Sequence, residues 1–261
     1  DSDMNGSSAN QVAWNWKAGT SFTNDASATG IGSIDSTGSV NTDAGFSIIS
    51  YTGTASAATV AHGLGAVPKM IIVKTRGSSG DWSVYHSSLG NTKNLKLNTT
   101  AAQQTSASYW NNTTPTSSVF TINDEGNVNG SSVAMIAYCF AEKSGYSSMG
   151  QYTGNGNADG TFVYTGFKPA FVMIKKTDSA GNYWHIYDNK RSTSGSNVVD
   201  DVLYPNRSDA EYSEDRIDFV SNGFKIRTTN GDINTSGGNY IFMCFSENPF
   251  TTSTGVPATA R

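Results

Sequence analysis

The sequence has little charge, almost no cysteine and no long apolar run. Charged residues make up 15% of the 261 residues and the formal net charge is -4, so the clustered Lys and Arg that phosphate binding requires are missing. We therefore expect no nucleic-acid partner. No stretch of about 18 consecutive apolar residues occurs, so no membrane-spanning helix is expected. Long Leu-, Glu- and Lys-rich stretches are also absent, which argues against a helical protein.

The chain has two cysteines, Cys139 and Cys244, and each lies in an apolar run typical of a buried strand. A disulfide between them is possible. The two cysteines occupy matching places in two similar segments rather than facing positions, which favours buried free thiols that act as small hydrophobic side chains. Residues 1–9 are polar and the first residue is not Met, so we expect the chain to begin inside a longer precursor.

Gly, Ser, Thr and Asn replace the missing charges. The sequence has 27 Gly, 12 Tyr and 12 Phe but only 6 Pro. Aromatic and β-branched residues suit pleated, half-buried surfaces, and small polar residues suit turns. This composition predicts an all-β protein made of short strands.

The strongest pattern is an internal repeat. Residues 45–53 match residues 145–154, and residues 67–74 match residues 168–175. The later segments 136–142 and 241–247 also match, at an offset of 105 rather than 101. A slowly rising offset indicates small loop insertions between retained strands. The fold class predicted is therefore all-β, with two tandem antiparallel β-sandwich-like units related by internal repeat.

The repeat divides the chain into four parts. Residues 1–44 are predicted to hold the closing strand of an upstream unit, around Trp14 and Trp16, followed by a linker or surface loop over residues 20–43. The two sandwich units cover residues 45–143 and 144–250. Residues 251–261 form a C-terminal tail.

Turn residues separate the predicted strands of the second unit. The sharpest hairpin signal is Asn222-Gly223, where a type I′ turn would need positive φ at both residues. Pro68 and Pro169 each open a strand, a place where proline does not interrupt the ladder. The predicted strands are residues 151–153, 161–165, 170–177, 183–188, 217–220, 223–228 and 239–246.

Four motifs together resemble a known group of proteins. They are Gly-Phe-Ser-Ile-Ile-Ser-Tyr-Thr-Gly at 45–53, His-Gly-Leu-Gly-Ala-Val-Pro at 62–68, Tyr-Thr-Gly-Phe-Lys-Pro-Ala-Phe-Val-Met-Ile-Lys at 164–175 and Ile-Ala-Tyr-Cys-Phe-Ala-Glu at 136–142. The combination resembles a repeated domain of uncharacterised function found in virion and tail-fibre-like proteins of marine bacteriophages. The likeness covers most of residues 12–250, and residues 248–261 look like the C-terminus of such proteins. The resemblance implies a β-rich appendage on the virion and supplies no catalytic residues.

No set of residues predicts catalysis, a metal or a cofactor. The three histidines, His62, His86 and His185, lack metal-ligand spacing and are expected to be exposed to solvent. Residues 123–130 resemble a calcium loop, but Ile136 stands where the closing carboxylate belongs, so this segment and residues 230–234 are interpreted as hairpin turns. An irregular calcium cage stays open as an alternative. A run of carboxylates is expected in a solvated loop: Asp209, Glu211, Glu214, Asp215 and Asp218.

Aromatic residues in polar surroundings are the candidate binding residues. Trp82 and Trp184 alternate with aliphatic residues and are expected in the core. Tyr109-Trp110-Asn111-Asn112 lies in a polar stretch, where a ring can stack on a sugar and amides can bond hydroxyls. Packing of Trp110 at the end of its sandwich or at a subunit interface is the alternative. Tyr204 and Tyr212 in the second unit have the same two interpretations.

These patterns predict a virion appendage of tail-fibre or capsid-fibre type, not an enzyme. Its partners would be other virion subunits, further copies of itself in a homo-oligomer, with a trimer favoured, and a host-surface polysaccharide or protein. One alternative is a purely structural decoration or spacer protein. A second is a polysaccharide depolymerase, which would need a carboxylate pair in a cleft.

Overall fold

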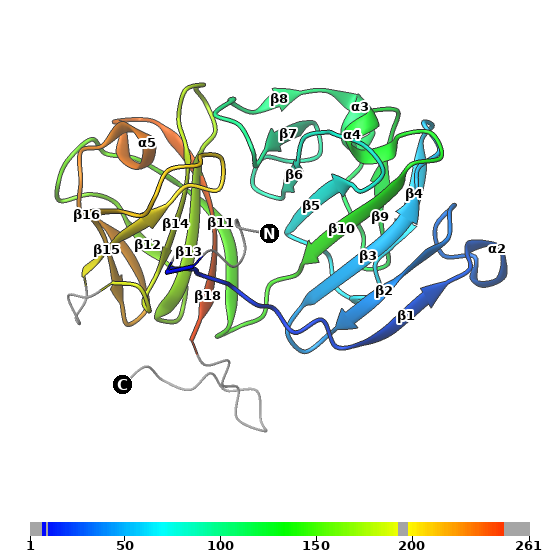
Figure 1. The fold of residues 1–261 in the computed structure, drawn as a ribbon, viewed down its shortest axis with the longest axis horizontal. Coiled ribbons are helices and arrows are strands. Elements are labelled where there is room, and N and C mark those ends of the chain that lie inside the picture. Colours follow the sequence, from blue (N-terminus) through cyan, green and yellow to red (C-terminus); the bar gives the residue numbers. More distant parts are fainter. Residues whose placement is uncertain (1–6, 9, 193–197, 248–261) are drawn as a thin grey trace.

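The computed structural model describes residues 7–8, 10–192 and 198–247. In this part of the chain two eight-stranded antiparallel sheets lie side by side (Figure 1). We call residues 10–143 the first half and residues 144–247 the second half. The prediction of an all-β, antiparallel protein is confirmed.

The first sheet is built from residues 20–140. Neighbouring strands are antiparallel, and a separate two-stranded sheet of β4 (Ala58–Ala61) and β9 (Val119–Ile122) accompanies it. The strands of the first sheet, in spatial order, are β1 (Thr20–Asn24), β2 (Ser36–Asn41), β3 (Phe46–Thr52), β10 (Ala134–Phe140), β5 (Met70–Thr75), β6 (Ser83–His86), β7 (Lys93–Lys96) and β8 (Gln104–Thr105).

The second sheet curls into a nearly closed barrel. Its first and last strands are β11 and β12, which are consecutive in the chain but do not pair with each other. In spatial order the strands are β11 (Ser147–Thr153), β18 (Asn239–Ser246), β13 (Pro169–Lys176), β14 (Trp184–Asp188), β15 (Val198–Leu203), β16 (Tyr212–Val220), β17 (Gly223–Ile226) and β12 (Phe162–Tyr164).

Helices are short. The described ones are α2 (Ala26–Thr29), α3 (Ala107–Trp110), α4 (Gly126–Asn129) and α5 (Gly231–Asn234), each of four residues. The hairpin turns expected over residues 123–130 and 230–234 are instead these last two helical turns, capped by Glu125 and Asn230. None of the helices in the described ranges has the length or apolar character to cross a membrane.

The two sheets share one apolar layer. Phe46, Met70 and Phe140 of the first sheet pack with Phe171 and Phe245 of the second in a single buried cluster. The other face of each sheet covers a separate core of its own half. The central strands are therefore buried on both faces, which explains why they read as nearly continuous apolar runs.

Polar bonds join the halves at the margin of this layer. The indole Nε1 of Trp184 donates to the carbonyl of Lys96 at 2.9 Å. His86 accepts from the Ser88 N–H at Nδ1, so its Nε2 donates to the Phe242 carbonyl at 3.2 Å. Each bond satisfies a polar atom that the packing of the two sheets would otherwise leave without water.

The same two interactions occur in both halves. Tyr51 donates its hydroxyl proton to the carbonyl of Val128 at 2.6 Å, and Tyr152 donates to the carbonyl of Ile233 at 2.7 Å. The last residue of α4, Asn129, and the last residue of α5, Asn234, each accept from one backbone N–H and donate to two carbonyls. The N–H groups belong to Thr54 and Asn155, and the carbonyls to Asn123 and Ser56 in the first half and to Thr228 and Asn157 in the second.

One cross-strand pair has its larger side chain on different strands in the two halves. Ile49 of β3 lies opposite Ala137 of β10, whereas Gly150 of β11 lies opposite Phe242 of β18. A Cβ atom on Gly150 would lie 2.7 Å from the Phe242 ring. The Phe242 ring therefore fills the space beside Gly150, and the combined volume of glycine and phenylalanine is similar to that of isoleucine and alanine.

Two expectations about local structure are wrong. The hairpin between β16 and β17 exists, but Val220 pairs with Gly223, so its turn residues are Ser221 and Asn222. Gly223 is needed for a close approach instead, because a Cβ atom there would lie 2.0 Å from the Val163 carbonyl oxygen of β12.

The second wrong expectation concerns residues 20–43. They were expected to form a linker, yet they contain β1 and β2, and β2 pairs with β3 along its length. Preceding this hairpin, Trp14 and Trp16 pack against the shared layer without forming a strand. Small polar residues hid the strand pattern, because β1 is largely exposed and β2 consists of Ser, Thr, Gly and Asn around a single apolar residue, Val40.

The exchanged pair predicts strong coupling between Gly150 and Phe242. Gly150→Ile alone should cost about 1–3 kcal/mol by overpacking, and Phe242→Ala alone about 3–5 kcal/mol by leaving a cavity. The double variant should be more stable than the sum of these losses predicts, because isoleucine fills the space of the ring. Urea denaturation of the four proteins measures the coupling, and simple additivity would contradict the volume exchange.

Candidate functional site

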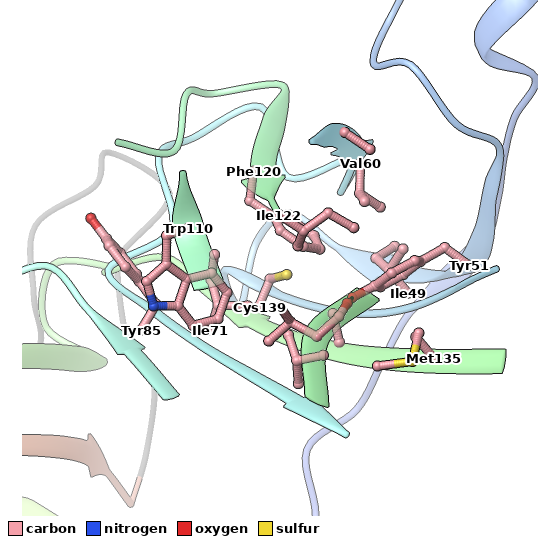
Figure 2. Packing of buried hydrophobic residues seen from close by; sticks show 14 of the residues in the cluster. Ile49, Tyr51, Val60, Ile71, Tyr85, Trp110, Phe120, Ile122, Met135 and Cys139 are labelled. Carbon is pink, nitrogen blue, oxygen red and sulfur yellow. Dashed lines mark hydrogen bonds between the residues drawn. The ribbon is translucent and has the colours of Figure 1, made fainter. Parts of the chain in front are cut away.

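The structure buries two of the predicted binding residues. Tyr109 and Trp110 are each 2% exposed, and the rings of Trp110 and Tyr85 meet edge to face with centroids 5.8 Å apart. Figure 2 shows both rings at one end of the first-half core, with Tyr51 and Met135 at the other. Of the two interpretations given for Trp110, exposure for sugar stacking is wrong and packing inside the first half is what the structure has, because the turn of α3 directs both side chains inward.

The remaining predicted residues do not form one site. Asn111 and Asn112 are exposed in left-handed conformations directly after α3, a helix of the first half (Figure 1). Tyr204 follows β15 and Tyr212 opens β16, both in the second half. Tyr212 is 54% exposed. Of the six residues, Tyr204 is the one that belongs to a larger polar cluster.

This cluster, which we call the Tyr204 cluster, consists of Tyr183, Tyr204 and Arg207. The guanidinium of Arg207 lies 4.4 Å from the ring centroid of Tyr183 and 5.4 Å from that of Tyr204. The two rings are themselves 5.5 Å apart. Asp209 pairs with the outer side of the arginine. Two half-buried rings and an exposed cation therefore share one surface, an arrangement held by cation–π attraction.

A buried layer of polar groups supports the cluster. The His185 ring packs edge to face under Tyr204 with centroids 4.8 Å apart. Arg216 of β16 is 6% exposed and donates to His185 Nε2 at 3.1 Å, and its Nε donates to Glu214 at 2.6 Å. The arginine charge is thus balanced by a carboxylate, as a buried cation requires.

Hydrogen bonding fixes His185 in one neutral tautomer. An arginine can only donate, so Nε2 must accept and the proton sits on Nδ1, which donates to the Tyr183 carbonyl at 3.2 Å. Burial and then the Arg216 charge lower the pKa of His185 to about 3. Asp232 Oδ2 lies 3.9 Å from Nε2, but a neutral ring makes no ion pair with it. A histidine this weakly basic is unsuited to proton transfer at neutral pH.

Two further charges lie nearby on β13 and α5. Lys175 donates from Nζ to the Asn182 carbonyl at 2.8 Å, and burial lowers its pKa to about 8. Partial burial raises the pKa of the Asp232 carboxyl. These groups make the second half more polar beneath its surface than the first, where Ser83 takes the strand position of His185.

Sequence reasoning missed this layer because it expected exposed histidines. His62, His86 and His185 are all fully buried. The signal that could have revealed His185 is the alternation in β14: Trp184 and Ile186 face the shared layer, so His185 and Tyr187 must face the second-half core. In a strand buried on both faces, a polar residue is buried too.

Among the described residues, no group of three His, Cys, Asp or Glu side chains could hold a metal ion. Cys139 and Cys244 are buried free thiols, as favoured. The carboxylate run is not simply a loop, because Glu214, Asp215 and Asp218 lie within β16.

Trp110 is predicted to contribute to stability. Trp110→Ala should lower the free energy of unfolding by about 3–5 kcal/mol because it removes a fully buried ring from the first-half core. Thermal or urea unfolding measures this loss, and Asn112→Ala, which changes an exposed neighbour, is the comparison. A stability equal to that of the parent would place Trp110 outside the core.

The buried histidines predict weaker folding in acid. The pKa of His185 falls from an ordinary 6.5 to about 3 and that of His86 to about 4, so between about pH 6.5 and 4 only the unfolded chain binds these protons. Stability should therefore be complete above pH 6.5 and fall as the pH drops through this window, by up to about 1.4 kcal/mol per pH unit for each histidine. His185→Gln should reduce this slope in urea denaturation at a series of pH values. An unchanged slope would mean that folded His185 takes up a proton near its ordinary pKa.

Comparisons with known proteins give one match. The model of a domain of unknown function, DUF7483, matches residues 1–249, which include both sheets and the N-terminal segment. No curated protein matches the chain, and no solved structure matches it. Since the matched region spans nearly the whole sequence, the chain belongs to the DUF7483 family.

Proposed function

We propose that this chain is a non-enzymatic module of a bacteriophage virion appendage, of tail-fibre or capsid-fibre type, that binds a glycan or protein on the host surface through the Tyr204 cluster. The resemblance of its strand motifs to virion and tail-fibre-like proteins supports the location. The arrangement of Arg207 against Tyr183 and Tyr204 carries the binding role, because flat rings beside a charged donor suit the faces and hydroxyls of a sugar.

The difference between the two halves in the segments that join their strands also supports a binding role for the Tyr204 cluster. Both halves hold the same tyrosine and asparagine bonds in their cores, which supports a frame that is repeated. We propose that the halves are copies of one unit. On this frame α3 occupies the first half where the second half has β16, and the Tyr204 cluster lies beside β16. Variable segments on a repeated frame are where specificity can be placed.

The buried polar residues beneath the Tyr204 cluster suit a binding role better than a catalytic one. His185 is held neutral between Arg216 and the Tyr183 carbonyl, and it contacts Tyr204 from below. This packing restricts the rotamers of the rings above it, which lowers the entropy lost when a ligand binds. We further propose that the appendage is a homotrimer, in which three weak sites gain strength by multivalency.

Binding to a microarray of bacterial surface polysaccharides tests the proposal. Arg207→Ala should weaken about tenfold the binding of the glycans that the parent protein binds. The substitution removes the cation, and the rings of Tyr183 and Tyr204 lose the contact that orders them. Arg76→Ala removes an exposed arginine from the first half and should leave binding unchanged. Equal binding by Arg207→Ala and the parent would remove the Tyr204 cluster as the site. No affinity for any cell-surface material would favour a purely structural role.

A further inference from the structure

The second half has an open seam between two strand edges. β11 and β12 end the barrel-like sheet, and a groove of about 330 Å³ lies between them. Ser148, Gly150 and Gln151 of β11 form one wall, and Phe162 and Tyr164 of β12 form the other. Phe162 is 45% exposed and Tyr164 is 69% exposed, so aromatic surface borders the groove.

The first half has the corresponding seam, and there it is filled. β4 corresponds to β12, since each pairs with the strand that precedes a single-turn helix, β9 and β17 respectively. Residues 33–41 bridge β3 and β4: β2 pairs with β3, and Ser33 and Ile34 bond the backbone of β4. Ser36 adds a bond from its hydroxyl to the Ala61 carbonyl at 3.0 Å.

Backbone groups of β11 face this seam. The N–H of Gly154 bonds the Gly238 carbonyl on the β18 side, and bonding directions alternate along an antiparallel strand. Gln151 therefore directs its N–H and carbonyl away from β18 and toward the groove. The equivalent residue in β3, Ser50, pairs there with Thr37 of β2.

One position of the edge is capped by a carboxylate. Glu142 accepts from the Met149 N–H at 2.7 Å and from the Ser148 hydroxyl at 3.3 Å. The matching N–H in β3, that of Ile48, faces β2, where Ser39 lies opposite. A charge at an edge strand discourages indiscriminate pairing, and it can be displaced by a strand that fits.

We propose that the seam between β11 and β12 is an acceptor for one extended strand of another polypeptide, which runs antiparallel to β11 and has small, uncharged residues as β2 does. The partner supplies what the second half lacks, because β10 leads through a short turn directly into β11 and leaves no preceding strand to fill the seam. Backbone bonds to Gln151 give affinity, and contact with Phe162 and Tyr164 gives selectivity.

A synthetic peptide with the sequence of residues 33–41 (Ser-Ile-Asp-Ser-Thr-Gly-Ser-Val-Asn) is the probe. Fluorescence anisotropy with the full chain should show saturable binding, and hydrogen exchange at the amide of Gln151 should slow in the complex. A peptide with Ser39→Pro, which cannot donate at a ladder position, should lose binding at least about tenfold while the protein stays unaltered.

A pair of protein variants separates the seam from other surfaces. Glu142→Ala should bind the peptide about fivefold more tightly, because the Met149 N–H is released for the incoming strand. Glu247→Ala removes a carboxylate that bonds Asn189 and Lys190 instead and should bind like the parent. Equal affinity of the parent and Glu142→Ala would overturn the assignment of the seam.

Two further outcomes would also overturn the proposal. One is equal binding of the proline peptide, since strand addition needs that backbone donor. The other is binding that emerges only after residues 248–261 are removed, since the chain's own end would then be the occupant. Saturable binding to the full chain with protection of Gln151 supports a strand from another polypeptide.

Discussion

The apolar layer between the two sheets is the constraint on which the rest of the structure depends. Phe46 and Phe140 from one sheet and Phe171 and Phe245 from the other close over Trp16, so neither sheet exposes its second face to water. Each sheet then uses its remaining face for a core of its own. Three stacked apolar layers follow from this arrangement, and every central strand must be apolar on both sides.

Burial on both faces has consequences for the polar residues of these strands. His86 and His185 cannot reach solvent, so each is held neutral by fixed hydrogen bonds, one across the two sheets and one beneath the Tyr204 cluster. The cost of burying Arg216 is offset by Glu214 and by the neutral imidazole. A polar foundation of this kind positions surface rings without itself being available for chemistry.

Closure differs between the halves although their cores share the same bonds. The first sheet gains β1 and β2, which cover the edge of β3, whereas the second gains β16, which extends the barrel and leaves β11 uncovered. The side chains opposite each other on these strands differ as well. The pair is Ile49 and Ala137 in the first half, whereas in the second half the edge strand β11 carries Gly150 and its neighbour β18 carries the larger Phe242. The two candidate surfaces of the second half, the Tyr204 cluster and the seam, both lie where the halves diverge.

The sequence by itself determined the strand class, the matching segments such as those of β5 and β13, and the core positions of Trp184 and both cysteines, because local alternation and apolar runs encode burial directly. It did not decide between an exposed and a packed Trp110 in α3, and it did not reveal the strands β1 and β2, whose small polar residues carry no apolar period. Only the tertiary structure decided those features, together with the burial of His185. Whether such a residue is buried depends on packing against parts of the chain that are distant in sequence. The residues next to it in the sequence do not indicate that packing.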